Sequence, residues 1–253
     1  MDIKKRLGWK RDRADTRDHR YLAAFTRLPS FLPEVDLRRF VPEIEDQGDL
    51  GSCVAHAITM ALRWHIRRSG AVDRELSRLM LYYYGRVIEN CVNEDSGLEI
   101  RDGIKAVTKY GVCDEKLWPY DVSKFKVEPP KDCQRLGKMW DNLTYERVRT
   151  QNAYIKSALS EGFPVVFGVM LYESFDSDSV ARTGKIPMPD PEREAELGGH
   201  CMLLLGYKNG RYIVQNSWSN KWGDRGYCYI PETYVSSSRL GAGDYWVIKN
   251  LVE

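Results

Sequence analysis

The fold is decided by residues 46–62, which read Asp-Gln-Gly-Asp-Leu-Gly-Ser-Cys-Val-Ala-His-Ala-Ile-Thr-Met-Ala-Leu. The glycine-containing loop ends at Ser52, and from Cys53 to about Arg68 there is no Gly or Pro while apolar residues recur at helical spacing. The pattern predicts a helix that begins at Cys53, with Ser52 as its N-cap. The free N–H groups and positive dipole end of this helix would face the sulfur and favour thiolate over thiol. Cys53 is therefore a candidate nucleophile, although most unpaired cysteines are small buried hydrophobic residues.

A thiolate nucleophile needs a base, and the chain holds four histidines. His19 lies in a basic extension outside the apparent domain. His56 and His65 lie on the predicted Cys53 helix, where His56 would leave little room for a substrate and is better explained as a core histidine. His65 is some ~18 Å further along the axis. Elimination leaves His200 as the candidate base.

His200 precedes the apolar strand 201–205, and a second strand, 211–215, ends at Asn216. If a loop centred on Lys208 joins the strands, His200 and Asn216 lie directly opposite each other and their side chains share one face. Asn216 would then orient the imidazole and leave its other nitrogen for the sulfur. A two-residue Asn209-Gly210 turn would instead shift the register and separate the two side chains.

Gln47 precedes Cys53 in the loop that would wrap the thiol. Its side-chain amide and the Cys53 N–H can together donate to a developing oxyanion. Because a loop glutamine is ordinarily a surface residue, this role depends on the other assignments.

The rest of the chain changes character near residue 140. Helices are predicted at 53–68, 76–89, 100–110 and 151–161, and short β-prone runs at 164–170, 201–207, 211–215, 226–230 and 245–248. Residues 172–199 are predicted to form a long surface loop. The sequence thus indicates an α+β protein with a helical and a β-rich subdomain, and a cleft between them as the default site.

Several motifs, in the right order, resemble the papain/cathepsin family of cysteine peptidases. They are the segments Gln47–Cys53, Gly199-His200, Asn216-Ser217-Trp218 continuing to Gly226-Tyr227, Leu32-Pro-Glu-Val-Asp-Leu-Arg38, and Trp118-Pro119-Tyr120. The separation of Cys53 and His200, 200 − 53 = 147 residues, also suits this family. The resemblance spans about residues 32–250 and is closest to a bacterial-type member without the usual helical propeptide.

The resemblance implies a papain-like fold with a helical left domain, a β-barrel-like right domain and the active-site cleft between them. We expect a basic extension at 1–31 and a peptidase domain at 32–253. Within the domain, the helical part covers about 42–140, and the β-rich part covers about 141–250 plus 32–41. The family also implies a Cys53–His200 ion pair, with Trp218 covering the His200–Asn216 hydrogen bond.

Some positions depart from the family pattern. Leu50 replaces the cysteine usually found three residues before the nucleophile, so the disulfide made by that cysteine is absent. Val54 and His56 replace aromatic residues and alter the wall near the sulfur. Cys91 and Cys133 flank the helical domain as one family disulfide does, so the resemblance leaves that bridge open. Three further cysteines are expected to be reduced core residues: Cys113, Cys201 and Cys228.

The family's backbone-binding strip corresponds roughly to Gly97-Leu98. Gly97 and Leu98 are therefore candidate substrate-binding residues. The second subsite, which holds the second substrate residue before the cleaved bond, is assigned to Ile100, Gly168, Gly198 and Gly199. Trp218 completes the set. An apolar preference is expected at the second subsite, while a charged contribution from Glu99 or Arg101 stays open.

Residues 1–20 hold eight Lys or Arg against four Asp, within a chain of net charge +2. This extension is a partly disordered solvated arm, an arm that packs on the back of the domain, or a short latch over the groove that is anchored by Trp9 and Tyr21. It has no apolar stretch typical of a signal peptide, which indicates an intracellular location unless a specialised secretion route is used. Binding of nucleic acid by this arm is a weaker alternative.

The sequence therefore predicts a monomeric thiol endopeptidase that acts on proteins or peptides and needs no metal or cofactor. Two alternatives remain: an exopeptidase or acyl-transferring relative whose groove is closed at one end by residues 172–199, and an inactive papain-like binding module. The sequence contains no run of 18 apolar residues, so no membrane span is predicted.

Overall fold

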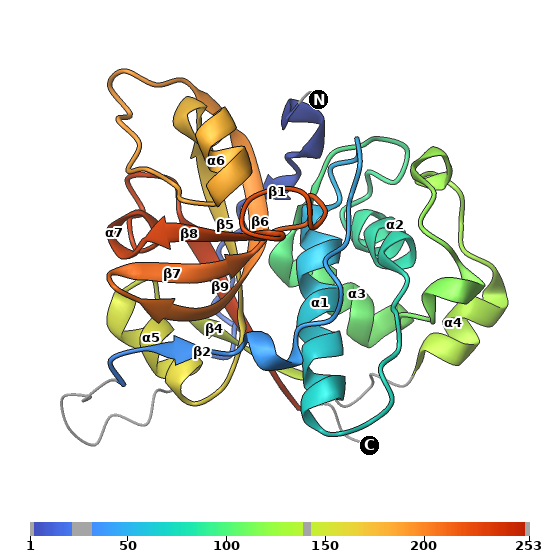
Figure 1. Ribbon diagram of the computed structural model, residues 1–253. Coiled ribbons are helices and arrows are strands. Elements are labelled where there is room, and N and C mark those ends of the chain that lie inside the picture. The colour runs from blue at the N-terminus through green and yellow to red at the C-terminus, as the bar shows by residue number, and fades with distance from the viewer. Residues whose placement is uncertain (1–2, 22–31, 139–142, 251–253) are drawn as a thin grey trace.

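The computed structural model describes residues 3–21, 32–138 and 143–250. Figure 1 shows a helical half and a β-rich half side by side, with the amino-terminal segment entering between them. The predicted boundary near residue 140 lies outside the described residues. Within the described part, no helix is long and apolar enough to cross a membrane.

The helical half is built around one central helix, α1. Its helices are α1 (Cys53–Arg68), α2 (Arg78–Ile88), α3 (Ile100–Tyr110) and α4 (Lys131–Gly137). Three further helices pack on the β-rich half: α5 (Asn152–Ser160), α6 (Asp178–Thr183) and α7 (Glu232–Val235). Short 3-10 turns occur at Ile3–Arg6, Arg38–Phe40, Glu115–Leu117, Val122–Lys124 and Glu173–Phe175. The predicted bounds of α1 and α3 agree with these, and α3 ends at Gly111, whose φ of +79° suits glycine.

The β-rich half is one antiparallel sheet in the order β4-β9-β5-β6-β7-β8, with β2 also paired to β6. Its strands are β2 (Val35–Asp36), β4 (Thr144–Val148), β5 (Val165–Tyr172), β6 (Glu196–Lys208), β7 (Arg211–Gln215), β8 (Tyr227–Pro231) and β9 (Gly243–Asn250). No pairing between the first and last of these described strands closes the sheet, so it is not a closed barrel. Two further strands, β1 (Trp9–Lys10) and β3 (Leu98–Glu99), form a separate parallel pair.

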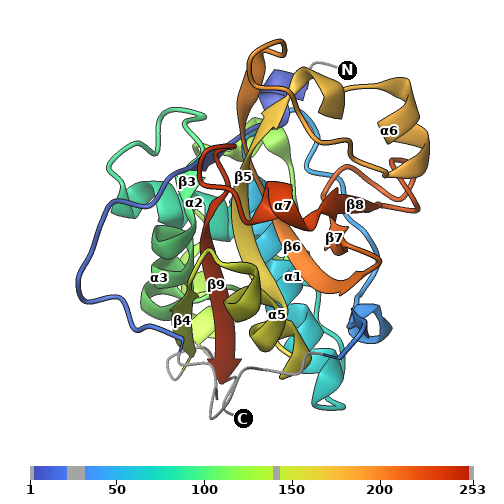
Figure 2. The same ribbon diagram turned by 90° about the vertical axis from the view of Figure 1, so that its left-hand side faces the viewer.

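Strand β6 joins the two halves because both of its faces are buried. Met202 and Leu204 pack in the core of the β-rich half, whereas Cys201, Leu203 and Leu205 pack with α1 in the helical core. This division follows from the alternation of side chains along a strand. Helix α1 therefore lies directly against the strand that carries His200 (Figure 2).

The prediction of a long surface loop at 172–199 is wrong. The segment contains a 3-10 turn and helix α6, and its last residues begin strand β6. Phe175, Val180 and Ile186 are buried in the β-side core, which explains why this polar-looking stretch is ordered. Scattered single apolar residues gave too little periodicity to predict it.

All six cysteines, which lie within the described ranges, are free. The bridge between Cys91 and Cys133 that the resemblance left open is therefore not formed. Cys133 is instead buried with Cys113 in a small cluster between helices α2, α3 and α4. The expectation that Cys113, Cys201 and Cys228 are reduced and buried is confirmed.

Candidate active site

Cys53 is the first residue of α1 and is fully buried. Ser52 occupies the predicted N-cap position, but its side chain makes no capping hydrogen bond. The Ser52 hydroxyl instead lies 2.6 Å from the hydroxyl of Tyr120, which donates to the Gln47 carbonyl at 2.7 Å. Tyr120 thus ties the loop to the helical half.

The thiol of Cys53 is not held as a thiolate in this structure, contrary to the expectation from the helix dipole. Burial raises its pKa to about 11, and the backbone N–H groups of Cys201 and Gly8 lower it only in part. Desolvation outweighs the helix terminus because no water reaches the sulfur. The Cys201 N–H also places the sulfur beside His200, the preceding residue of β6.

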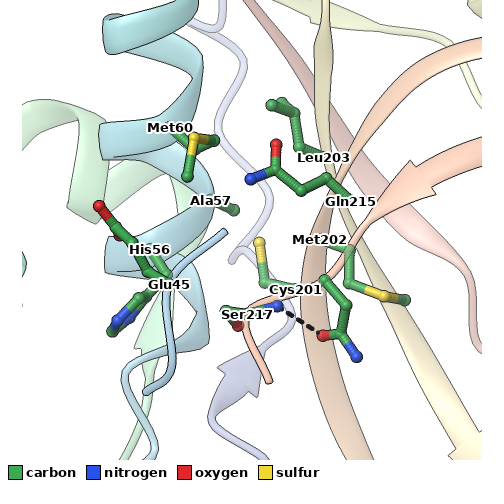
Figure 3. A pocket seen from close by; sticks show the side chains of 10 residues that line it. Glu45, His56, Ala57, Met60, Cys201, Met202, Leu203, Gln215 and Ser217 are labelled. Carbon is green, nitrogen blue, oxygen red and sulfur yellow. Dashed lines mark hydrogen bonds between the residues drawn. The ribbon is translucent and has the colours of Figure 1, made fainter. Parts of the chain in front are cut away.

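His200 Nε2 lies 2.8 Å from Asn216 Oδ1, and both side chains are buried. Asn216 Oδ1 also accepts the Ser217 N–H at 2.8 Å, shown as the dashed line in Figure 3. Because this oxygen is an acceptor for both, we assign the imidazole proton to Nε2. Nδ1, which has no hydrogen-bond partner among the described residues, is left as the basic nitrogen.

The turn that brings this pair together differs from the prediction. Lys208 pairs with Arg211, so the loop is the two-residue Asn209-Gly210 turn, with φ of +50° and +72°, and a loop centred on Lys208 is wrong. Extended without interruption, this register would place Asn216 opposite Leu203 (208 + 211 − 216 = 203), on the wrong face.

A register shift between Leu204 and Gly206 corrects the face. Beyond it Leu203 pairs with Gln215, so Asn216 lies opposite residue 202 (203 + 215 − 216 = 202). His200 is two residues from that position, a diagonal neighbour on the same face. The irregularity therefore brings His200 and Asn216 to the same face of the sheet, which the predicted loop centred on Lys208 was expected to do.

Burial also lowers the pKa of His200 to about 4, although the Asn216 hydrogen bond raises it. The Trp218 ring lies over the imidazole, with 4.9 Å between ring centroids. Burial therefore favours the neutral form of both His200 and Cys53 in this closed arrangement. His56, one of the two histidines on α1, is buried against the Tyr120 ring and makes no contact with Asn216 or Trp218 that would mark it as the base.

Gln47 is fully buried, and its amide is fixed on three sides. Its Oε1 accepts the Ser217 hydroxyl at 2.6 Å, while its Nε2 donates to the Leu50 carbonyl at 2.8 Å and to the Arg6 carbonyl at 2.9 Å. The Leu50 and Arg6 carbonyls, which can only accept, define which end of the amide is the donor. Sequence reasoning missed this role of Ser217, since the two residues are 170 apart.

Residues 3–21, which we call the amino-terminal arm, begin between the two halves of the molecule (Figure 1). The Gly8 backbone N–H lies within hydrogen-bonding reach of the Cys53 sulfur. The Leu98 N–H donates to the Gly8 carbonyl at 2.7 Å, and β1 pairs with β3 in parallel. A Cβ on Gly8 would lie 1.9 Å from the Gly51 carbonyl oxygen, so only glycine can pass here. Trp9, next along the arm, is almost fully buried.

Most of the candidate substrate-binding residues contact this arm. A Cβ on Gly168 would lie 1.9 Å from the Trp9 ring, a Cβ on Gly199 would lie 2.3 Å from the Trp9 carbonyl, and a Cβ on Gly97 would lie 2.1 Å from the Gly8 carbonyl. Leu7 packs at Gly198 in the same way. Ile100 is fully buried in the core cluster that includes Trp9, and the Arg6 guanidinium lies 6.0 Å from the Trp218 ring.

The arm is anchored beyond the groove at two places. Asp12 accepts the Trp246 indole N–H at 2.8 Å, and its own N–H donates to Asp244 at 2.7 Å. Burial, and then the neighbouring Asp244 carboxylate, raise the pKa of Asp12 to about 7. Further on, the arm runs along strand β4, where Tyr21 N–H donates to the Arg147 carbonyl at 3.0 Å and the Tyr21 side chain is buried.

A small cavity lies behind the site, between α1 and strands β6 and β7 (Figure 3). On the other side of Trp218 a larger hollow of about 580 Å³ opens. Its lining includes Arg6, Asp46, Ala181, Lys221 and Trp222. Helix α6, which carries Ala181, therefore borders this hollow.

Comparisons with known proteins agree with this geometry. A family model described as papain family cysteine protease matches residues 32–241. An uncharacterized peptidase C1-like protein of Acanthamoeba polyphaga mimivirus is 39% identical over 266 residues, which cover 96% of this chain and 85% of that protein. The crystal structure of xylellain, a cysteine protease from Xylella fastidiosa, superposes with a TM-score of 0.90 at 34% identity, covering 99% of this chain and 97% of that one. Digestive procathepsin L 3 of Tenebrio molitor larval midgut shares the fold at 17% identity, with a TM-score of 0.73 and coverage of 98% and 77%.

Proposed function

Because the chain belongs to the papain family of cysteine proteases, we propose that it hydrolyses peptide bonds with Cys53 as nucleophile and His200 as base. Cys53 attacks the substrate carbonyl as a thiolate, after His200 Nδ1 has taken its proton. His200 returns that proton to the leaving amine. Water, deprotonated by His200, then cleaves the thioester and restores the thiol.

One observation carries this proposal: the Gln47 amide, in the loop before Cys53, already donates to a peptide carbonyl of the segment that passes the thiol. The Arg6 carbonyl accepts the Gln47 Nε2–H at 2.9 Å, two residues before Gly8 passes the thiol. The other Nε2–H is held by Leu50, so the donor is fixed in advance. Such a donor needs no reorganisation when charge develops on the substrate oxygen, and the Cys53 N–H supplies the second donor.

Gln47→Ala is expected to lower kcat by roughly 10²–10³-fold, the usual effect of removing one oxyanion donor. The matched variant is Ser217→Ala, which keeps the donor but loses the hydroxyl that orients it, and should have a smaller effect. Both are measured as kcat and KM on a fluorogenic peptide. A Gln47→Ala variant that loses only affinity, with kcat unchanged, would exclude this role.

The arm is proposed to be an intramolecular inhibitor. The arm runs parallel to β3. A substrate would run in the opposite direction, with the residues before its cleaved bond along Gly97-Leu98 and its carbonyl at Cys53. The arm therefore fills the groove in a direction that does not present its own bonds for attack. It also keeps Cys53 and His200 dry, and so neutral.

Trp9 supports an apolar second subsite between Gly168 and Gly199. The test uses a variant that lacks residues 1–14, here called Δ1–14. In it, Gly168→Ala should lower kcat/KM by roughly 10–200-fold for peptides with an aromatic residue at the second position before the cleaved bond. Peptides with alanine at that position should be affected little, because the added methyl group then meets no side chain. Equal losses for both peptides would place the subsite elsewhere.

Endopeptidase activity is favoured over exopeptidase activity by the hollow beyond Trp218, which leaves room for substrate residues after the cleaved bond. The test is cleavage of internally quenched peptides blocked at both ends. A chain that cleaves only peptides with a free terminus would be an exopeptidase.

A further inference from the structure

Three carboxylates converge beside β3, outside the Cys53–His200 pair. Oxygens of Glu89, Glu99 and Asp102 all lie within 4.8 Å of one another. The side chains of Glu89 and Glu99 are only 2% and 6% exposed. Glu89 Oε1 is fixed by the Glu99 N–H at 2.7 Å, which leaves Oε2 for another partner.

The arm supplies two of the three cations that balance this charge. The Lys10 ammonium pairs with Glu89 Oε2, and the Arg13 Nε–H donates to Glu99 Oε1 at 2.8 Å. Lys105, which belongs to the domain itself, lies 3.5 Å from Asp102. When the arm leaves the groove, Glu89 and Glu99 therefore lose these two counter-charges, an unfavourable state for two neighbouring carboxylates.

The position of Lys10 relates this acidic cluster to the substrate path. Counting outward from the thiol, Gly8 passes the sulfur, Trp9 fills the pocket between Gly168 and Gly199, and Lys10 pairs in register with Glu99. A substrate strand along β3 would place its third residue before the cleaved bond beside the same carboxylates. Only a long side chain with a terminal cation reaches Glu89 as Lys10 does.

We propose that Glu89 and Glu99 form a subsite that selects lysine or arginine at the third residue before the cleaved bond. The inference rests on the proposed function, in that it takes the arm's route as the route of the substrate. Lys10 is then the arm's imitation of the preferred substrate side chain, and Glu89 is the specificity-determining residue because it alone receives the ammonium.

The first test uses the full-length chain carrying Trp9→Ala and Lys10→Ala, which loosen the arm. Peptides that differ only at the third position, lysine against norleucine, should differ in kcat/KM by about tenfold to a hundredfold, as expected for a hydrogen bond to a buried charged group. Adding Glu89→Gln should abolish most of this preference, so that the lysine and norleucine peptides are cleaved with similar kcat/KM. Glu94→Gln, which removes an exposed charge from the same loop, should keep the preference.

A second measurement is independent of catalysis. The same full-length background with Cys53→Ala is titrated with a labelled peptide of arm residues 3–14, carrying either Ala or Trp at position 9 and either lysine or norleucine at position 10. The lysine peptides should bind at least about tenfold more tightly, and Glu89→Gln should remove the difference. Equal binding of the lysine and norleucine peptides would overturn the subsite, even if every peptide is cleaved. Loss of all cleavage with the binding difference intact would instead count against the proposed function alone.

Discussion

Deleting residues 1–14 is expected to raise the rate of alkylation of Cys53 at pH 7 by at least about a hundredfold. With a pKa of about 11, only ~10⁻⁴ of the buried thiol is ionised at that pH. Once the arm leaves, water, the helix terminus and a protonated His200 can stabilise the thiolate, which lowers the pKa of the thiol. A less basic thiolate is a weaker nucleophile, which offsets part of the gain in thiolate, while freer access to the sulfur adds to it.

The pH profile makes the sign of this effect testable. In the full-length chain, a thiol with a raised pKa should react faster as the pH rises through 9 and beyond. In Δ1–14, the rate should already be at its plateau near neutral pH. Alkylation by iodoacetamide is followed by mass spectrometry in a Cys91→Ser background, because Cys91 is partly exposed while the other five cysteines are buried. Full-length Trp9→Ala weakens the seating of the arm by a point mutation, and should raise the alkylation rate of Cys53 by less than Δ1–14 does.

Δ1–14 keeps residues 15–21, so the pairing of the arm with β4 and the buried Tyr21 are preserved. A melting temperature close to that of the full-length chain would show that the domain remains folded. If the folded variant and the full-length chain then react at the same rate, the arm does not control access to Cys53.

The second large effect is expected for His200→Ala in the Δ1–14 variant, which should lose roughly 10²–10⁴-fold in kcat/KM. The variant lacks both the base for Cys53 and the acid for the leaving amine. Asn216→Ala should lose less, because the imidazole remains but can turn away from the sulfur once the 2.8 Å contact is gone. The losses in kcat and kcat/KM are measured on one fluorogenic peptide, at substrate concentrations well above and well below KM.

His65→Gln is the matched control for the histidine substitution. It removes the imidazole that lies twelve residues along α1 from Cys53, and should leave kcat/KM within a few-fold of Δ1–14. If His200→Ala retained full activity while His65→Gln or His56→Gln abolished it, the assignment of the base by elimination would be wrong.

The family and the papain-like fold could be read from the sequence, since local signals and ordered motifs agreed. Helix α1 was predictable because a glycine loop precedes an uninterrupted apolar repeat. The contact between His200 and Asn216 was predicted from a loop centred on Lys208, which the structure does not contain. The Asn209-Gly210 turn was recognisable as a hairpin signal, but the shift at Leu204/Gly206 was not, since such irregularities depend on the packing of both faces of β6.

The state of the thiol could not be predicted, because it depends on a segment some 45 residues earlier in the chain (53 − 8 = 45). A helix terminus argues for a thiolate only if water or a counter-charge is present. The arm removes the water, and nothing in its basic composition shows that Gly8 and Trp9 fit a groove made by residues 51, 97, 168 and 199. Its anchors, Trp9 and Tyr21, were visible as aromatic residues in a polar stretch, and both are buried.

The attachment of the arm along β4 has a consequence for how the groove is reoccupied after it opens. Because Tyr21 stays bound, the residues that block Cys53 remain tethered within a short reach of the groove, at an effective concentration of about millimolar. Dilution of the protein would therefore not release the inhibition, and a substrate at micromolar concentration would compete poorly with the arm. A single cut in the chain between the groove and Tyr21 would convert this tethered ligand into a free peptide, which dilution could then carry away.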